Sequence, residues 1–216
     1  RWHAHGNIYL VAEGEYELDP ATDGAVEILN VDGDDVDVAI VNPDGSHAEM
    51  SGNGTRIAGA WLMERTGSDS ARVHVGDRIV EVRRAGDQFD ADLEVVVVAR
   101  ERIAGLDVIV VSVGNPHAVV VGDPADIELI GPLLETHPRF PERTNVQVVR
   151  VDGPGEVTAR VWERGVGETT ASGSSAVAVA AATHDDGDVL VHFPGGDLRV
   201  RLHDGRATLT GPAQPI

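Results

Sequence analysis

Apolar and polar residues alternate along much of the chain. Several segments place valine, isoleucine or leucine next to aspartate or arginine, with the two-residue period of half-exposed strands. Asp-Gly, Gly-Pro and Gly-Gly pairs between these segments mark turns. The pattern predicts strands over Asn7–Val11, Asp35–Val41, Ala71–Val75, Arg78–Arg83, Leu93–Ala99, Leu106–Val113, Ala118–Val121, Asn145–Val151, Glu156–Trp162, Val189–Phe193 and Leu198–Leu202.

Only a few segments have helical character. Thr55–Thr66 places apolar residues at i, i+3 and i+4 spacing, which predicts a helix. Ser174–Thr183 consists almost wholly of small residues, and its alanine content predicts a buried helix. Two shorter helix candidates are Pro124–Leu129 and Ile130–Glu135. A few helices among many strands indicate an α+β protein.

A glycine-rich turn with a serine precedes each of the two longer helices. The first turn contains Ser51-Gly52, and the second contains Ser172-Gly173. This repetition suggests two similar α+β domains with a cleft between them. We expect a boundary near residue 105, which gives one domain over 1–104, with a C-terminal strand at about 206–216, and another over 105–205.

Composition and charge exclude several classes of function. The 216 residues carry 36 acidic and 17 basic side chains, a net charge of −19, which argues against a surface for nucleic acid or anionic membrane. The chain has no cysteine, which excludes disulfides, thiolate nucleophiles and zinc–thiolate sites. Every basic residue is arginine, which excludes lysine Schiff-base chemistry, including that of pyridoxal phosphate.

No recognisable metal or nucleotide motif is present. The histidines have no metal-ligand spacing, Asp185–Asp188 lacks the glutamate of an EF-hand loop, and Gly165-Val166-Gly167 lacks the third glycine of a dinucleotide fingerprint. We therefore expect no metal and no cofactor. Because no run of 18 apolar residues and no apolar leader occurs, we also expect a cytoplasmic protein.

The two serine-glycine turns are candidate anion sites. A helix N-terminus has unpaired backbone N–H groups and a partial positive charge, and glycine lets a ligand approach that backbone closely. Two such termini facing one cleft could hold an amino-acid carboxylate and stabilise a carbanion beside it. The alternative is that Ser51 and Ser172 only cap their helices.

Polar residues also cluster where strands are predicted to end. Gly114–His117, Glu142–Asn145 and Glu163–Thr169 are such clusters, and functional residues favour loops on a rigid scaffold. Taken alone, His117 could be structural, and Glu163-Arg164 could be a surface ion pair of little energetic value.

Separated motifs, in order along the chain, match a known family. They are His5-Gly6-Asn7, Asp23-Gly24, the segment 42–56 with the sequence NPDGSHAEMSGNGTR, Gly114–His117, Phe140–Val146, Glu163–Thr169 and Pro194-Gly195-Gly196. On these motifs the chain resembles diaminopimelate epimerase, a member of the cofactor-independent racemase group that includes proline racemase. The resemblance implies two pseudo-symmetric domains, each a β-barrel-like sheet around a central helix, with the active site in the interdomain cleft.

The resemblance also implies an activity. The family inverts the α-carbon at one end of L,L-diaminopimelate to give the meso form, in lysine and peptidoglycan biosynthesis, without a cofactor. One residue removes the α-proton and another delivers a proton from the opposite face. By motif, these positions are Ser51 and Ser172, with His117 and Glu163 beside them. The implied substrate contacts are Asn7, Asn42, Gly52, Asn53, Asn115, Asn145, Glu163, Arg164, Gly173 and Ser174. A homodimer is a further expectation from the family.

The chain departs from the family pattern at both flanking positions, where the family has cysteine and this chain has serine. A thiol has a pKa of about 8.5, whereas an alcohol is a far weaker acid and a poorer source of a base. Serine could still function if His117 or Glu163 deprotonated it. The chain is thus a natural serine variant, an engineered cysteine-free protein, or an enzyme whose reaction has changed. It is also shorter than the family norm, chiefly between Tyr16 and Asp23.

Two other functions fit parts of this pattern. One is a lyase of the same superfamily, such as a hydroxyproline dehydratase, for which removal of a proton on one face suffices. The other is a non-catalytic protein that binds amino acids. The asparagine-rich set of contacts, together with Glu163-Arg164, favours the epimerase because it suits a substrate with a second amino-acid end.

Overall fold

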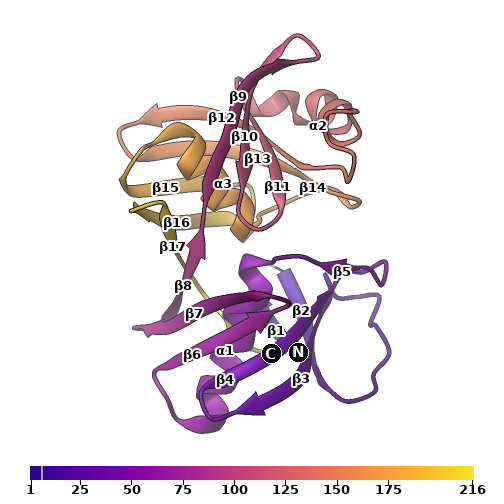
Figure 1. Ribbon diagram of the computed structural model, residues 1–216, viewed down its shortest axis with the longest axis vertical. Coiled ribbons are helices and arrows are strands. Elements are labelled where there is room, and N and C mark those ends of the chain that lie inside the picture. Colours follow the sequence, from indigo (N-terminus) through magenta and orange to yellow (C-terminus); the bar gives the residue numbers. More distant parts are fainter. Residues whose placement is uncertain (6) are drawn as a thin grey trace. The chain divides into compact units, whose positions relative to one another are not determined.

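The computed structural model describes residues 1–5 and 7–216, so Gly6 of the His5-Gly6-Asn7 motif lies outside the described residues. The chain forms two compact units (Figure 1). Unit 1 comprises residues 1–93 and 210–216, and unit 2 comprises residues 94–209. The boundary expected near residue 105 falls within unit 2. Ala104 and Gly105, with φ of 50° and 83°, form the turn between two paired strands. A local turn signal does not distinguish a hairpin from a linker.

Unit 1 combines short strands with one helix. Its elements are β1 (Trp2–Ala4), β2 (Asn7–Glu13), β3 (Ala25–Asp32), β4 (Asp35–Val41), β5 (His47–Ala48), α1 (Gly52–Thr66), β6 (Ser70–Val75), β7 (Arg78–Ala85), β8 (Gln88–Glu94, which ends at the unit boundary) and β18 (Gln214–Pro215). The order of pairing is β1-β2-β3-β4-β6-β7-β8, and the β2–β3 and β4–β6 pairs are parallel. The two chain ends meet, because β1 pairs with β18.

Helix α1 is the centre of unit 1. Ser51 caps its N-terminus, and Gly67 ends it in the left-handed conformation, with φ of 78°. The helix packs against β6 and β7 and also contacts β1, β3 and β4. Most of its residues are buried, which explains why it lacks a strong polar face. Gly59 gives the clearance that this packing needs, since a Cβ there would lie 2.6 Å from Val82.

Unit 2 contains a longer set of elements. They are β9 (Val96–Ile103), β10 (Leu106–Ser112), β11 (Pro116–Val121), the 3-10 helix η1 (Pro124–Asp126), α2 (Ile127–Glu135), β12 (Asn145–Gly153), β13 (Glu156–Glu163), β14 (Gly167–Thr169), α3 (Gly173–Thr183), β15 (Gly187–Phe193), β16 (Gly196–His203) and β17 (Arg206–Gly211, which runs on into unit 1). The order of pairing is β9-β10-β11-β12-β13-β15-β16, and the β11–β12 and β13–β15 pairs are parallel.

The two units repeat one topology. In unit 1 the helix α1 follows the β4–β5 hairpin and leads to β6, which pairs in parallel with β4. In unit 2 the helix α3 follows the β13–β14 hairpin and leads to β15, which pairs in parallel with β13. The main difference is the segment that connects the two strands of the first parallel pair. Between β11 and β12 in unit 2 this segment contains η1 and α2, whereas between β2 and β3 in unit 1 it consists only of residues 14–24. This short connection includes the stretch between Tyr16 and Asp23, where the resemblance led us to expect a shorter chain.

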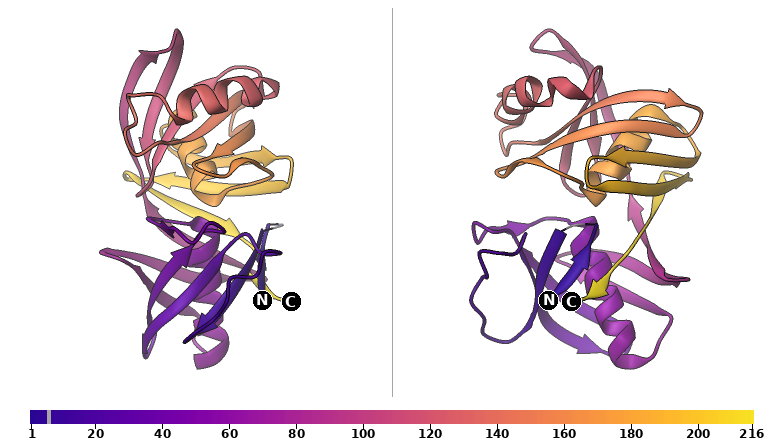
Figure 2. Two further views of the ribbon diagram at one scale, coloured as in Figure 1. Left: turned by 90° about the vertical axis from the view of Figure 1, so that its right-hand side faces the viewer. Right: turned by 180° about the vertical axis from the view of Figure 1, so that it is seen from behind.

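Helix α3 is enclosed by the strands of unit 2. It contacts β10, β11, β12, β13, β15 and β16, and Figure 2 shows it inside the curve of these strands. Nearly all its residues are buried, as expected for a helix of glycine, serine, alanine and valine. Helix α2 packs on β12 and β13, where Ile127, Ile130 and Leu134 join a core cluster.

Several predicted elements differ in extent from those observed. The strand expected over Leu93–Ala99 is interrupted at Val95, between β8 and β9. The helix candidates Pro124–Leu129 and Ile130–Glu135 are instead one 3-10 turn followed by the single helix α2, which tolerates Pro132 within it. Strands β1, β3, β5 and β14 were not predicted, β8 was predicted only at its end, and β17 lies within the C-terminal strand expected at about 206–216. In the described residues, no helix is long and apolar enough to span a membrane.

Candidate active site

Ser51 caps α1 and also contacts a tyrosine. Its backbone is extended, with φ of −144° and ψ of 117°, and its Oγ accepts a hydrogen bond of 3.0 Å from the amide of Gly54. The Tyr9 hydroxyl on β2 lies 3.4 Å from the same Oγ. Because an amide can only donate, the hydroxyl hydrogen of Ser51 points elsewhere. The Gly54 amide and the Tyr9 hydroxyl therefore both contact the Ser51 oxygen.

The other expected contacts of unit 1 lie on the elements around Ser51. Asn7 begins β2, and Gly52 and Asn53 form the first turn of α1, where both are buried. Asn42 follows β4, and its side-chain amide donates to the Ser46 hydroxyl at 3.0 Å. This bond holds the Asn42 side chain within its own turn. The Asn53 side chain is held by a hydrogen bond from Arg56.

Arg56 is a buried cation beneath the first turn of α1. Its guanidinium donates to the side-chain carbonyl of Asn53 at 2.7 Å, while Nε and Nη1 have no hydrogen-bond partner among the described residues. Burial lowers the pKa of Arg56 to about 10, so the group stays charged at neutral pH. A buried charge without a carboxylate partner costs stability.

Ser172 occupies the corresponding place at α3 but is less constrained. It is the N-cap residue, with φ of −146° and ψ of 128°, and its side chain makes no capping hydrogen bond. Gly173 and Ser174 form the first turn of α3, and all three residues are buried. The Ser172 hydroxyl is not used by its helix, in contrast to that of Ser51.

A buried hydrogen-bond chain runs behind the start of α3. Gln147 donates to Nδ1 of His117 at 3.0 Å and to the Ser175 hydroxyl at 2.9 Å. His117 Nε2 in turn bonds the side-chain carbonyl of Asn115 at 2.9 Å, and the amide of Asn115 lies 3.5 Å from the Ser174 hydroxyl. Asn115 is thus positioned by this chain.

The same chain removes His117 from the role expected of it. Both ring nitrogens are engaged, and burial lowers the pKa of His117 to about 3. The imidazole is neutral at neutral pH and bonds neither serine of the candidate pair. Contrary to the sequence-based expectation, His117 is a positioning residue in this geometry, because Gln147 and Asn115 occupy the nitrogens that a base would use.

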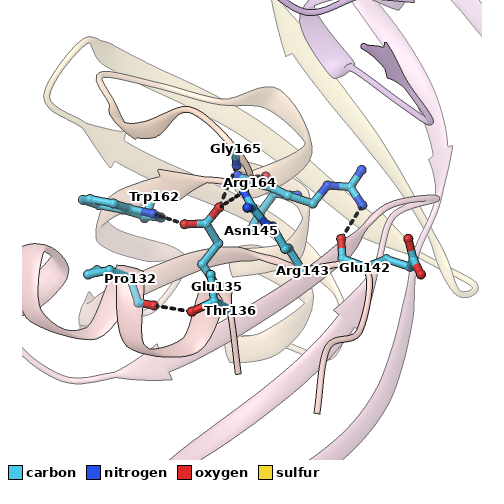
Figure 3. Close-up of polar contacts among 9 residues, drawn as sticks. All are labelled: Pro132, Glu135, Thr136, Glu142, Arg143, Asn145, Trp162, Arg164 and Gly165. Carbon is cyan, nitrogen blue, oxygen red and sulfur yellow. Dashed lines mark hydrogen bonds and ion pairs between the residues drawn. The ribbon is translucent and has the colours of Figure 1, made fainter. Parts of the chain in front are cut away.

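Asn145 organises the loop that carries Glu163 and Arg164. Its amide donates to the carbonyl of Pro116 at 3.0 Å, and its carbonyl accepts from the Arg164 backbone at 3.0 Å. The Arg164 guanidinium reaches the carbonyl of Glu142 at 3.3 Å (Figure 3). The Glu163 carboxylate accepts a hydrogen bond of 2.5 Å from Thr169. The motif residues of unit 2 are therefore connected to one another.

Glu135, which sequence analysis missed, anchors this loop. It ends α2, and its carboxylate accepts from the Trp162 indole at 2.8 Å and from the amide of Gly165 at 2.7 Å (Figure 3). An acidic residue in the last turn of a helix is disfavoured by the helix dipole. An acidic residue at the end of a predicted helix is therefore the only signal in the sequence, and the burial of Glu135 appears only in the structure.

Strand register identifies equivalent positions in the two units. In unit 1, β3 pairs in parallel with β2 and antiparallel with β4, and in unit 2, β12 pairs in the same way with β11 and β13. Each set of three strands therefore contains a row of three residues that lie side by side. These aligned rows are Leu10, Ala25 and Val41 in unit 1, and Ala118, Val146 and Trp162 in unit 2. Counting from these rows, the equivalent residues are Asn7 and Asn115, Tyr9 and His117, Asn42 and Glu163, and Ser51 and Ser172.

A small pocket in unit 2 lies away from these residues. His184, Asp185, Leu202 and Arg206 line it at the C-terminal end of α3, whereas Ser172 is at the N-terminal end. Among the described residues, no group of three or more histidine, aspartate or glutamate side chains could hold a metal ion.

Solved structures share this fold. A predicted epimerase from Pseudomonas aeruginosa matches with a TM-score of 0.72 and 19% identity, over 100% of this chain and 95% of the other. A hydroxyproline epimerase from Agrobacterium vitis matches with a TM-score of 0.72 and 14% identity, over 100% and 89%. The duplicated α+β unit with a capped central helix thus defines an epimerase- and racemase-like fold.

Sequence relatives are closer. The diaminopimelate epimerase family model matches residues 109–216. The diaminopimelate epimerase of Desulforudis audaxviator is 38% identical, over 100% of this chain and 96% of the relative, and that of Xylella fastidiosa strain M23 is 42% identical, over 82% and 73%. The chain belongs to the diaminopimelate epimerase family.

Proposed function

We propose that this protein is a cofactor-independent isomerase that inverts the α-carbon of L,L-diaminopimelate to give the meso form. The relatives at 34–42% identity are named diaminopimelate epimerases, and epimerisation accounts for the residues better than the lyase or a binding-only role. The observation that carries the proposal is the pair of serines at topologically equivalent helix N-termini. An inversion needs one proton-transferring group for each face of the carbon.

Each residue has a role in this proposal. Ser51 and Ser172 exchange protons with the α-carbon, and the amides of Gly52 and Gly173 with their helix dipoles stabilise the α-carboxylate as negative charge develops. Glu163 and Arg164 bind the substrate by charge. The remaining proposed contacts are Asn7, Asn42, Asn53, Asn115, Asn145 and Ser174.

The proposal extends to cellular context. A cytoplasmic location and a homodimer rest on family membership, and light scattering of the purified protein tests the homodimer. Because diaminopimelate is a zwitterion without net charge, local groups of the site, rather than the overall field of a protein with a net charge of −19, bind it.

Exchange of the α-proton tests the activity directly. The protein is incubated with L,L-diaminopimelate in D2O, and the α-proton signal and the ratio of stereoisomers are followed by NMR. Exchange with inversion is the expected result. Exchange without inversion would contradict a two-sided mechanism and indicate a one-base reaction.

The matched control restores the family's thiols. A variant carrying Ser51→Cys and Ser172→Cys is assayed alongside the wild type. Exchange only in the variant would mean that the substrate site is intact but that the serine pair is inactive. Absence of exchange in both would refute diaminopimelate as the substrate.

A further inference from the structure

The two candidate serines have different surroundings. Tyr9 and His117 are equivalent by strand register, but His117 is tied to Gln147 and Ser175 in unit 2. The equivalents of those two partners in unit 1 are Val26 and Gly54, which carry no side-chain donor or acceptor. The Tyr9 hydroxyl in unit 1 lies 3.4 Å from the Ser51 Oγ, a contact that His117 does not make with Ser172.

We propose that Tyr9 accepts the proton of the Ser51 hydroxyl as Ser51 removes the α-proton of the substrate, and that the buried Arg56 cation stabilises the Tyr9 phenolate. This inference rests on the proposed function and supplies the base that serine lacks. Tyr9 acts through Ser51, so it is a positioning and proton-accepting residue that need not touch the substrate.

The hydrogen-bond directions support this transfer. The Gly54 amide donates to Ser51 Oγ at 3.0 Å, which leaves the Ser51 hydrogen available for the Tyr9 oxygen. A separation of 3.4 Å is longer than the usual value of about 2.7–2.8 Å for hydroxyl pairs, and such catalytic contacts commonly shorten when substrate binds.

The proton balance is closed. The α-carbon–hydrogen bond breaks, and its electron pair remains on the carbon as a carbanion. That proton forms a new bond to Ser51 Oγ, while the original hydroxyl hydrogen passes to the Tyr9 phenolate oxygen. In the inversion Ser172 donates its hydroxyl proton to the opposite face of the carbanion, and proton exchange with water then reprotonates Ser172 and returns Tyr9 to the phenolate, so no oxidant, metal or co-reactant is consumed.

Arg56 gives the phenolate its counter-charge. The guanidinium is fully buried, and two of its three nitrogens have no hydrogen-bond partner among the described residues. Burial is the larger influence and lowers the pKa of Arg56, while the negative charge of an ionised Tyr9 raises it. By reciprocity, the cation favours ionisation of Tyr9. The position equivalent to Arg56 in unit 2 is Val177, so this support exists only in unit 1.

Other charged groups lie on the elements that are paired or packed with β2. On the elements paired or packed with β2, the Asp23 carboxylate accepts from the backbone amide of Ile8 at 2.8 Å. Glu27 on β3 contributes to raising the pKa of Tyr16. His3 on β1 pairs with Ile8 through the backbone.

The first test uses the fact that the chain has only two tyrosines, Tyr9 and Tyr16. Ultraviolet absorbance reports phenolate formation as pH is raised. Burial, with a smaller effect of Glu27, raises the pKa of Tyr16, so we expect Tyr9 to ionise first. Tyr9→Phe should remove the lower step and Tyr16→Phe the upper one. A lower step that survives Tyr9→Phe would overturn the proposal.

The second test measures exchange of the α-proton in D2O. Tyr9→Phe should slow exchange by at least about 100-fold, the usual contribution of a proton-transfer partner, while Tyr16→Phe leaves the rate unchanged. In a Ser51→Cys background the cost of Tyr9→Phe should fall below about ten-fold, because a thiol ionises without help. An equal loss in both backgrounds would indicate a merely structural tyrosine and refute the relay.

The two tests separate failure of the relay from failure of the proposed function. If the double cysteine variant exchanges the substrate proton and the wild type does not, the relay is refuted while the substrate assignment stands. If neither protein exchanges it, the substrate assignment fails. The tyrosine titration, which needs no substrate, still decides whether Arg56 favours the Tyr9 phenolate.

Discussion

The neutral, buried state of His117 predicts a specific loss of stability in acid. An unfolded histidine titrates at about 6.5, whereas burial lowers the pKa of folded His117 to about 3. At pH values between these two, His117 is protonated in the unfolded chain but neutral in the folded protein. Stability is therefore complete above about pH 6.5 and declines as pH falls toward 3.

The magnitude follows from this window. Each pH unit is equivalent to about 1.4 kcal/mol, so lowering the pH to about 5 should remove about 2 kcal/mol through His117 alone. That is a substantial share of the 5–15 kcal/mol that is typical of folded domains. At about pH 5 most carboxylates are still ionised, which keeps their contribution small.

Urea unfolding at about pH 7 and about pH 5 measures this loss. His117→Gln lowers stability overall, but the difference between the two pH values should shrink by about 2 kcal/mol relative to the wild type. The exposed His47 provides the control, because His47→Gln should leave the difference unchanged. If wild type and His117→Gln lost the same free energy, His117 would not be held neutral and could serve as a base.

Two further predictions concern packing and the loop of unit 2. Gly59→Ala would place a Cβ 2.6 Å from Val82, so it should destabilise the protein by about 1–3 kcal/mol, measured by calorimetry; an unchanged melting temperature would contradict the close packing of α1. The Glu135 carboxylate accepts a hydrogen bond of 2.7 Å from the Gly165 amide, and Glu135→Gln would place an amide donor against that amide. The substitution should lower the free energy of unfolding by about 1–3 kcal/mol and raise KM more than it lowers kcat. An effect on kcat alone would show that Glu135 does not act by positioning the loop.

Local patterns in the sequence predicted the elements that have strong periodicity. Helix α1 and most core strands follow from the spacing of apolar residues and the serine-glycine turns. Strand β3 was missed because much of it is exposed and it ends in polar residues, which weakens the alternation. The split prediction for α2 reflects Pro132, which packing of Ile130 and Leu134 accommodates within one helix.

The candidate site depends more on tertiary contacts. Motifs singled out Ser51 and Ser172 as candidates because a serine-glycine turn precedes each helix, although only the Ser51 side chain caps its helix. The role of His117 was not predictable, since Gln147 reaches it only through the parallel pairing of β11 with β12. Glu135 and Arg56 were likewise missed, because burial of a charged side chain is decided by distant parts of the chain.

The pairing of β1 with β18 has a consequence for how the protein is made. Unit 1 begins with the first residues but is completed by residues 210–216, which a ribosome adds after the whole of unit 2. Unit 2 is continuous in sequence and can fold as soon as it has emerged. Until β18 has been synthesised, β1 can pair only with β2. Unit 1, most of which is synthesised first, is therefore completed last.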